Sequence, residues 1–260
     1  MAIIFVLAAI IPIAPGGMQK SITRAIDGNN LHTIGQAWLA DETGRKGDLP
    51  PEALMDVYAL AAYLARTGAT PDPRLWITRL DTVVAPSYQF PGSIVNPDDK
   101  SQLTDAFRAA PLAFAAALVP MMSKLPPETP VMWTRGLKPD GTWRIDSPYG
   151  SWGGHVVFAN GTLKKFEGKI GGGLTKWGTH EPTSSIIEAL PPGTRISEYV
   201  PLTEIAEHLR RQMLLVRLAQ VGGLLLLAVI CVATRWGRRN WGPLAATGLL
   251  LAVWFFLWDR

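Results

Sequence analysis

The sequence predicts an α+β membrane protein in which a long N-terminal helix packs on a small antiparallel sheet and a two-helix transmembrane hairpin ends the chain. Three observations predict this fold class. An apolar run opens the chain and continues as an amphipathic segment, strand-like segments with turn residues follow, and two nearly uncharged apolar runs come last. We therefore expect a membrane helix over residues 1–18, a folded domain over 19–205 and a membrane-directed segment over 206–260.

The first helix is predicted from an uncharged run, Ile3–Ala14, and from the spacing of the apolar residues after it. These residues recur at intervals close to a helical period and share one stripe: Ile22, Ile26, Leu31, Ile34 and Trp38. Such a stripe is expected to pack against a sheet. The charged stretch Asp41–Asp48 is expected to follow as a solvated loop.

The middle of the chain predicts short elements. We expect a helix over residues 52–66 that ends at Gly68, a short strand over 75–77, a helix from Asp105 capped by Ser101 or Thr104, a buried strand over 113–119, and a strand over 130–134. The strongest local pattern lies in residues 154–166, where Asn160-Gly161 separates two apolar segments. That dipeptide predicts a β-hairpin with a type I′ turn.

The last sixty residues predict two membrane helices, at about 214–234 and 243–258. The loop between them, residues 235–241, carries three arginines and two tryptophans, so it is expected to face the cytoplasm. The domain before it would then lie on the opposite side. Two alternatives stay open: one tail run is a buried core helix, or the N-terminal run is a cleaved signal ending near Ala14-Pro15-Gly16-Gly17.

Charge and cysteine content exclude some function classes. The net charge of the 260 residues is +4, but the part from Leu209 onward has seven arginines against one aspartate, a balance of +6. The rest of the chain is therefore at −2, which argues against a nucleic-acid surface. Cys231 is the single cysteine, so neither an internal disulfide nor a cysteine-based metal site is expected.

Two separated segments resemble the type IV pilin and type II secretion pseudopilin family. The first is the apolar run with Asn29-Asn30-Leu31-His32-Thr33-Ile34-Gly35 and Gly47-Asp48-Leu49-Pro50-Pro51 after it, and the second is Trp152–Leu163, with its Gly-Gly-x-Val-x-Phe-x-x-Gly pattern. The resemblance implies a structural protein of the bacterial inner membrane with a periplasmic domain, which assembles through N-terminal helices and performs no catalysis.

One departure from that family concerns the start of the chain. Family members begin with a basic leader and a processing site, and neither precedes Met1 here. The expected explanations are a start that lies upstream or a lost processing signal. Two extra membrane spans would also resist extraction into a fibre, so the sequence favours a membrane-resident relative or accessory over a polymerising subunit.

No catalytic, cofactor or metal site is predicted. The histidines are scattered, and each is interpreted as a packing, surface or loop residue: His32, His155, His180 and His208. The oxygen-bearing residues Asn96, Asp98 and Asp99 are interpreted as a turn before a helix and not as a calcium loop. Gly171-Gly172-Gly173 lacks the lysine and serine of a phosphate loop and is interpreted as a turn.

Tryptophans of the strand-rich part give the alternative function. They are Trp133, Trp143, Trp152 and Trp177, and they either build the core of the sheet or form a contact surface. The second reading would make the protein a membrane-bound periplasmic sensor or a carbohydrate- or protein-binding module.

Overall fold

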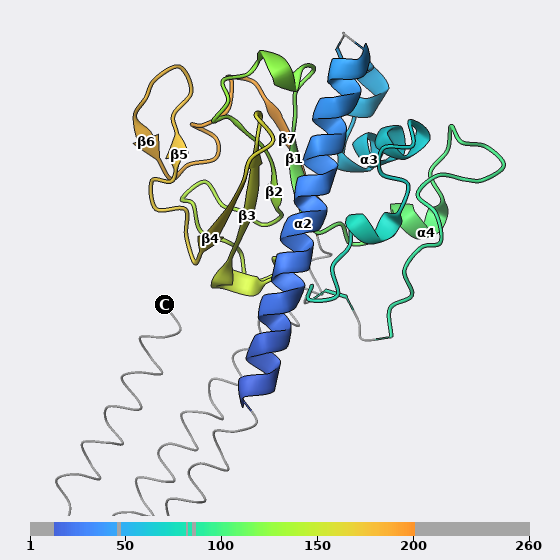
Figure 1. Cartoon of the computed structure of the whole chain (residues 1–260), viewed down its shortest axis with the longest axis horizontal. Helices are drawn as coiled ribbons and strands as arrows, with labels where there is room; N and C mark the ends of the chain where they lie inside the picture. Colours follow the sequence, from blue (N-terminus) through green and yellow to red (C-terminus); the bar gives the residue numbers. More distant parts are fainter. Residues whose placement is uncertain (1–12, 46–47, 82, 85–86, 201–260) are drawn as a thin grey trace, which may run out of the picture. The chain divides into compact units, whose positions relative to one another are not determined.

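The computed structural model describes residues 13–45, 48–81, 83–84 and 87–200. A five-stranded antiparallel sheet forms its centre, and one long helix, α2 (Ile13–Arg45), packs against the sheet. Figure 1 shows α2 running across the sheet with the shorter helices α3 (Val57–Arg66) and α4 (Asp105–Arg108) beside it, and α3 contacts the sheet at β1. The predicted helix on an antiparallel sheet is therefore found.

The membrane part of the predicted fold class is wrong for the residues that the structure describes. None of their helices combines the length and the apolarity that crossing a bilayer requires. The described part of the first helix carries charged and polar residues throughout its second half, which explains this result. The predicted hairpin at 214–234 and 243–258 and the first residues of the N-terminal run lie outside the described residues.

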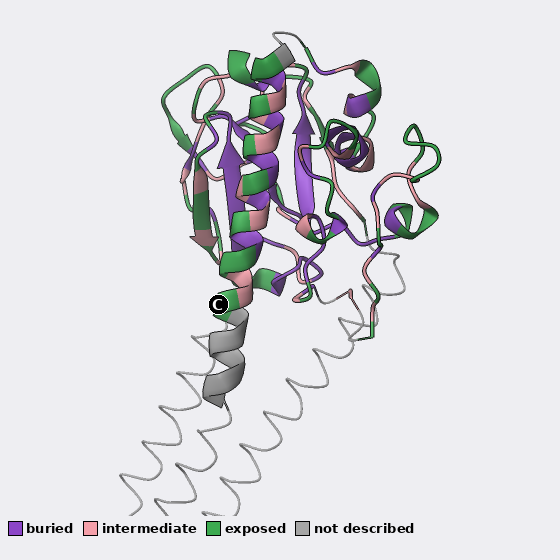
Figure 2. Cartoon of the chain, turned by 45° about the vertical axis from the view of Figure 1, so that its right-hand side comes forward, coloured by how far each residue is buried: buried purple, intermediate pink, exposed green. Residues whose placement is uncertain are grey.

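Helix α2 has 33 residues, about 50 Å at 1.5 Å per residue, and its described side chains are buried from Asp27 onward on the side that packs on the sheet. The buried stripe is Asp27, Leu31, Ile34, Trp38 and Glu42. Figure 2 shows it as the buried side of the helix. Ile22 and Ile26, predicted on the same stripe, are instead 56% and 53% exposed. The prediction failed there because Ile22 and Ile26 lie about 100–140° around the helix from the buried Asp27, at about 100° per residue, and so are on a different face.

The end of α2 is fixed by Glu42, inside the stretch predicted as a loop. Its carboxylate accepts hydrogen bonds from the backbone N–H groups of Met122 and Ser123 at 2.7 and 2.9 Å. These bonds tie the last turns of the helix to the short helix η3 (Met122–Lys124). The helix consequently continues to Arg45 before the chain turns.

The sheet has the strand order β4-β3-β2-β1-β7, and all neighbouring strands are antiparallel. Its strands are β1 (Phe114–Leu118), β2 (Pro130–Thr134), β3 (Gly153–Phe158), β4 (Leu163–Glu167) and β7 (Arg195–Ser197). The predicted strands at 113–119 and 130–134 and the hairpin at 154–166 are confirmed. The edge strand β7 was not predicted, because three residues are too few to show an alternation of apolar and polar side chains.

Glycines allow α2 to approach β3 closely. A Cβ added at Gly35 would lie 2.6 Å from a methyl group of Val157, and one at Gly28 would lie 3.0 Å from the His155 ring. His155 and Val157 therefore point from β3 toward the helix, whereas Gly154, directly before His155, faces Trp143 on the other side of the sheet. This alternation is the period of two expected of a strand.

The β3-β4 turn differs in detail from the predicted type I′ turn. The N–H of Gly161 donates to the carbonyl of Phe158 at 2.8 Å, so Gly161 is the fourth residue of the turn and not the third. The Asn160 side chain accepts from the N–H and the hydroxyl of Thr162 instead. The longer turn satisfies polar groups that a two-residue turn would leave to solvent.

The remaining short elements were predicted in part. The helix expected over 52–66 is split into η1 (Pro51–Leu54) and α3, because Asp56 accepts from Ala59 N–H and starts a new helix. The strand expected at 75–77 is wrong, since Leu75 ends η2 (Pro73–Leu75), Trp76 lies in a turn and Ile77 belongs to no regular element. Thr104 caps α4 as predicted. β5 (Leu174–Thr175) and β6 (Pro182–Thr183) form a separate two-stranded sheet.

Candidate functional site

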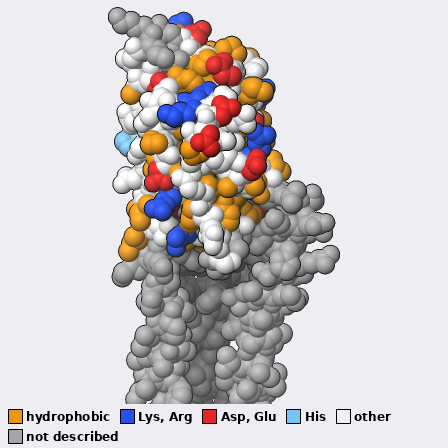
Figure 3. Space-filling view, turned by 90° about the vertical axis from the view of Figure 1, so that its right-hand side faces the viewer, with side chains coloured by type: hydrophobic (Ala, Val, Ile, Leu, Met, Phe, Trp, Pro, Cys, Tyr) orange, Lys and Arg blue, Asp and Glu red, His pale blue; other side chains and the backbone are white. Residues whose placement is uncertain are grey.

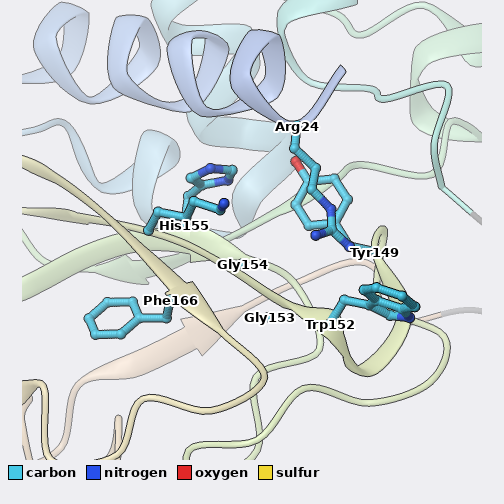
Figure 4. Close-up of a pocket in the computed structure, with 8 residues that line it drawn as sticks. Arg24, Tyr149, Trp152, Gly153, Gly154, His155 and Phe166 are labelled. Carbon is cyan, nitrogen blue, oxygen red and sulfur yellow. The ribbon is translucent and has the colours of Figure 1, made fainter. Parts of the chain in front are cut away.

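A shallow hollow lies where the exposed half of α2 meets the start of β3. It has a volume of about 160 Å³ that is open to solvent, and its lining comprises Arg24, Tyr149, Trp152, Gly153, Gly154, His155, Lys165 and Phe166. Figure 4 shows Arg24 reaching down from the helix to the rings of Tyr149 and Trp152. The hollow is therefore a shallow depression and not an enclosed pocket, so a ligand there would stay largely in contact with solvent.

Arg24 is held by aromatic rings. Its guanidinium carbon lies 5.2 Å from the centre of the Tyr149 ring and 5.5 Å from that of Trp152. Burial lowers the pKa of Arg24, but an arginine stays charged at neutral pH. Its Nε is buried without a hydrogen-bond partner. The rings thus orient a positive charge at the rim of the hollow.

Asp27 lies one helical turn further along α2 and is 3% exposed. Its Oδ2 accepts hydrogen bonds from the hydroxyls of Thr78 at 2.5 Å and Tyr149 at 3.0 Å. Burial raises the pKa of Asp27 to about 6, although both hydrogen bonds oppose the rise. Burial and the adjacent Asp27 also raise the pKa of Tyr149, so this hydroxyl stays protonated and donates.

His155 is a packing residue, in agreement with the sequence interpretation. It is 4% exposed, and its ring meets the Tyr149 ring edge-on with centroids 5.9 Å apart. Its Nδ1 is buried without a hydrogen-bond partner. Burial lowers the pKa of His155 to about 4, so the imidazole is neutral near pH 7.

A second polar cluster lies deeper in the fold, around Arg135 and Asp81. Both side chains are fully buried, and the guanidinium binds both carboxylate oxygens, with Nη2 2.7 Å from Oδ1. Arg135 also donates to the backbone carbonyls of Leu112 and Asp146 at 3.0 and 2.9 Å. Burial raises the pKa of Asp81, and Arg135 opposes this rise. The cluster connects three loops and has no opening to solvent.

The other candidate polar residues are engaged in local structure. Asn96 accepts from the N–H of Asp98, and Asp99 accepts from Ser101 and Gln102, so these oxygens close turns as predicted. His180 is exposed, and the Nε2 of His32 lies 3.3 Å from the amide nitrogen of Gln36. Within the described ranges, no cluster of three histidine, cysteine or acidic residues could hold a metal ion.

The four tryptophans of the strand-rich part do not form one surface. Trp133 and Trp143 are buried in the core, where the Trp143 indole donates to the Thr134 carbonyl at 3.0 Å. Trp177 is half-buried, and Trp152 is 54% exposed. Only Trp152 therefore presents a largely free ring.

Sequence reasoning missed both buried polar clusters. Asp27 was not among the residues predicted on the stripe of the first helix, yet it lies four residues before Leu31 and seven before Ile34. Those intervals put it on the buried stripe and were the available signal. Arg135 follows directly after the predicted strand at 130–134, and a charge next to an apolar strand was the corresponding sign there.

Comparison with known proteins identifies no relative. No family model matches the chain, and neither a curated protein nor a solved structure matches it significantly.

Proposed function

We propose that this chain is a pilin-like structural protein, a relative or accessory of a type II secretion or type IV pilus assembly, and that copies pack together through the first half of α2. The observation that carries the proposal is the exposure of Ile22 and Ile26, at 56% and 53%, on a face of the helix that does not pack on the sheet. The two residues are four apart, so they form one apolar ridge on the helix. A second copy of the helix would remove this ridge from water.

The placement of the family-like segments supports the proposal. The segment around Asn29–Gly35 packs on the hairpin β3-β4, where Gly28 meets His155 and Gly35 meets Val157. The side-chain amide of Gln36 also donates to the Gly161 carbonyl at 3.0 Å. The two segments that resemble pilins thus pack against each other, one on the helix and one on the hairpin. Such a contact is expected where a long helix packs on a sheet.

The hollow at Arg24 gives little support to an enzyme. Its volume of about 160 Å³ is open to solvent, whereas catalysis needs a site that positions a substrate and excludes water. The buried groups next to it, Asp27 and Tyr149, hydrogen-bond one another and are thereby used in packing. The proposal therefore assigns no catalytic step to the chain.

The surface is consistent with a protein that meets other proteins. On the face shown in Figure 3, acidic and basic side chains alternate among apolar ones. A nucleic-acid-binding face would instead gather Lys and Arg into one patch. Mixed charge of this kind keeps neighbouring copies from repelling each other strongly at close range.

Disulfide crosslinking of the full-length protein tests the proposal. Cys231→Ser removes the single native cysteine, and Ile22→Cys or Ile26→Cys then places one thiol on the ridge. We expect oxidation to convert most of the protein into covalent dimers, because like positions of packed helices come within reach of a disulfide. Met55→Cys is the matched control, since Met55 is 67% exposed and lies after η1. It should stay monomeric.

The result that would reject the proposal is equally specific. Equal crosslinking at positions 22, 26 and 55 would indicate random collision. A protein that stays monomeric in light scattering, at the concentration used for crosslinking, would rule out assembly through α2.

A further inference from the structure

Arg24 has the geometry of an anion-binding residue. Its guanidinium rests on the Tyr149 and Trp152 rings, and none of the ion pairs among the described residues involves it. A guanidinium stacked on aromatic faces loses little freedom on binding, and its planar N–H groups match the two oxygens of a carboxylate. The side chain is thus oriented in advance for a carboxylate at the rim of the hollow.

Trp152 supplies a flat apolar surface beside this charge. It ends the short helix η4 (Gly150–Trp152) and is 54% exposed. Its backbone is fixed on both sides, because its carbonyl accepts from Gly168 N–H at 3.1 Å and its N–H donates to the Tyr149 carbonyl at 3.4 Å. A rigid, exposed indole next to a cation is a suitable surface for the apolar face of a ring.

The other charges around the hollow leave Arg24 as its principal free cation within the described part of the chain. Lys165 pairs with Glu167 at 2.9 Å, and that carboxylate also interacts weakly with Arg24. His155 is neutral near pH 7, and the Asp27 carboxylate lies buried behind Tyr149. Lys165 is therefore already paired with Glu167, and the Arg24 guanidinium is the group that can pair with an anionic ligand.

We propose that this hollow binds a single acidic sugar ring, a uronate, whose carboxylate pairs with Arg24 and whose ring lies on Trp152. The site offers one cation beside one exposed indole, which is a contact for a single ring and not for an extended chain. The site would add ligand recognition to the structural role and does not depend on assembly through α2.

The glycines of the hollow are explained by packing and are therefore no evidence for a ligand. A Cβ at Gly153 would lie 2.1 Å from the Phe166 carbonyl oxygen, and one at Gly154 would lie 2.7 Å from the Trp143 ring. Packing gives no comparable reason for the exposed indole of Trp152. The proposal rests on that indole and on the uncommitted charge of Arg24.

Titration of the full-length protein with three small molecules tests the proposal directly. Galacturonate carries both the ring and the carboxylate, galactose carries the ring alone, and acetate carries the carboxylate alone. We expect galacturonate to bind with a dissociation constant of roughly 1 mM, as suits a shallow site, and the other two at least about tenfold more weakly. Tryptophan fluorescence would report binding, and its change should disappear in Trp152→Phe.

Variants then assign the binding to the two residues. Arg24→Gln should weaken galacturonate binding at least about tenfold, and Arg24→Lys should recover only part of it, because lysine lacks the planar fork. Arg74→Gln and Trp177→Phe are the matched controls and should bind as the unmodified chain does. Equal binding of galactose and galacturonate, equal binding of acetate and galacturonate, or full binding by Arg24→Gln would each overturn the proposal.

Discussion

Asp27 and Asp81 are two buried aspartates in very different surroundings. Their exposed fractions are 3% and 2%. Asp81 is held by both terminal nitrogens of Arg135, whereas Asp27 receives only the hydroxyls of Thr78 and Tyr149. Burial raises the pKa of both carboxyl groups, but a cation opposes the rise at Asp81 alone. The Asp81 site is thus balanced in charge by Arg135, and the Asp27 site has no balancing cation.

This difference shows what each site contributes. Arg135 uses its remaining N–H groups to hold the carbonyls of Leu112 and Asp146, so the Asp81 pair joins loops at fixed positions. Asp27 joins α2 to Thr78 and Tyr149 through one oxygen that must be desolvated without a counter-charge. The first site is expected to resist changes in pH, and the second is expected to change protonation at about pH 6.

The largest expected effect comes from breaking the balanced pair. Arg135→Met keeps an apolar stem but leaves Asp81 as an unpaired buried charge, which should cost about 3–5 kcal/mol of unfolding free energy. Urea unfolding of the full-length protein, followed by circular dichroism, measures this loss. Arg74→Met, at an exposed arginine, is the control and should change stability by less than about 0.5 kcal/mol.

A second substitution separates lost packing from unpaired charge. Asp81→Asn in the Arg135→Met background removes the charge and should recover part of the stability. If it recovers nothing, or if Arg135→Met alone costs under about 1 kcal/mol, the pair does not hold these loops together.

The next largest effect is a gain of stability at the unbalanced site. Asp27→Asn keeps an oxygen that accepts from Thr78 and Tyr149 and removes the ionisable group. Because the pKa of Asp27 rises from 3.8 to about 6 on folding, ionisation destabilises the fold increasingly between about pH 4 and pH 6. The variant should therefore match the unmodified protein near pH 4 and exceed it by up to about 3 kcal/mol at pH 7.

Unfolding at these two pH values tests the prediction for Asp27. A gain that is the same at pH 4 and pH 7 would show that Asp27 does not titrate in this range. A loss at pH 7 would show that Thr78 and Tyr149 stabilise the carboxylate more than burial penalises it.

The contrast between the two aspartates also marks what could be predicted from the sequence. Periodicity placed Leu31, Ile34 and Trp38 on the buried stripe, and turn residues placed the β3-β4 hairpin, because both signals are local. The partners of Asp27 lie 51 and 122 residues away, and Asp81 and Arg135 are 54 apart. Nothing in the local pattern pairs residues at such distances.

The same limit explains the errors in the candidate site. Ile22 was assigned to the core because its spacing is helical, but Ile22 and Ile26 lie on a different face of the helix from the buried Asp27. Trp133 and Trp152 look alike as residues, and only the register of β2 and the position of η4 make one buried and the other exposed. Arg24 became a candidate when Tyr149, 125 positions later, came to lie beneath it.

The smallest expected effect tests how far one hydroxyl supports Asp27. Tyr149→Phe keeps the ring against Arg24 and His155 but removes the 3.0 Å hydrogen bond to the carboxylate. Since that bond lowers the pKa of Asp27, its loss should raise the pKa further above 6, and carboxyl NMR of the labelled protein would measure the change. Stability at pH 7 should fall by about 1–2 kcal/mol.

A double-mutant cycle tests whether the effect of Tyr149→Phe depends on the negative charge of Asp27. In the Asp27→Asn background the same hydroxyl meets a neutral acceptor, so Tyr149→Phe should cost only about half as much as in the unmodified chain. The comparison holds the aromatic packing constant, because both backgrounds lose the same oxygen atom. An equal cost in both would mean that Tyr149 acts through packing, and Asp27 would then depend on Thr78 alone for support of its negative charge.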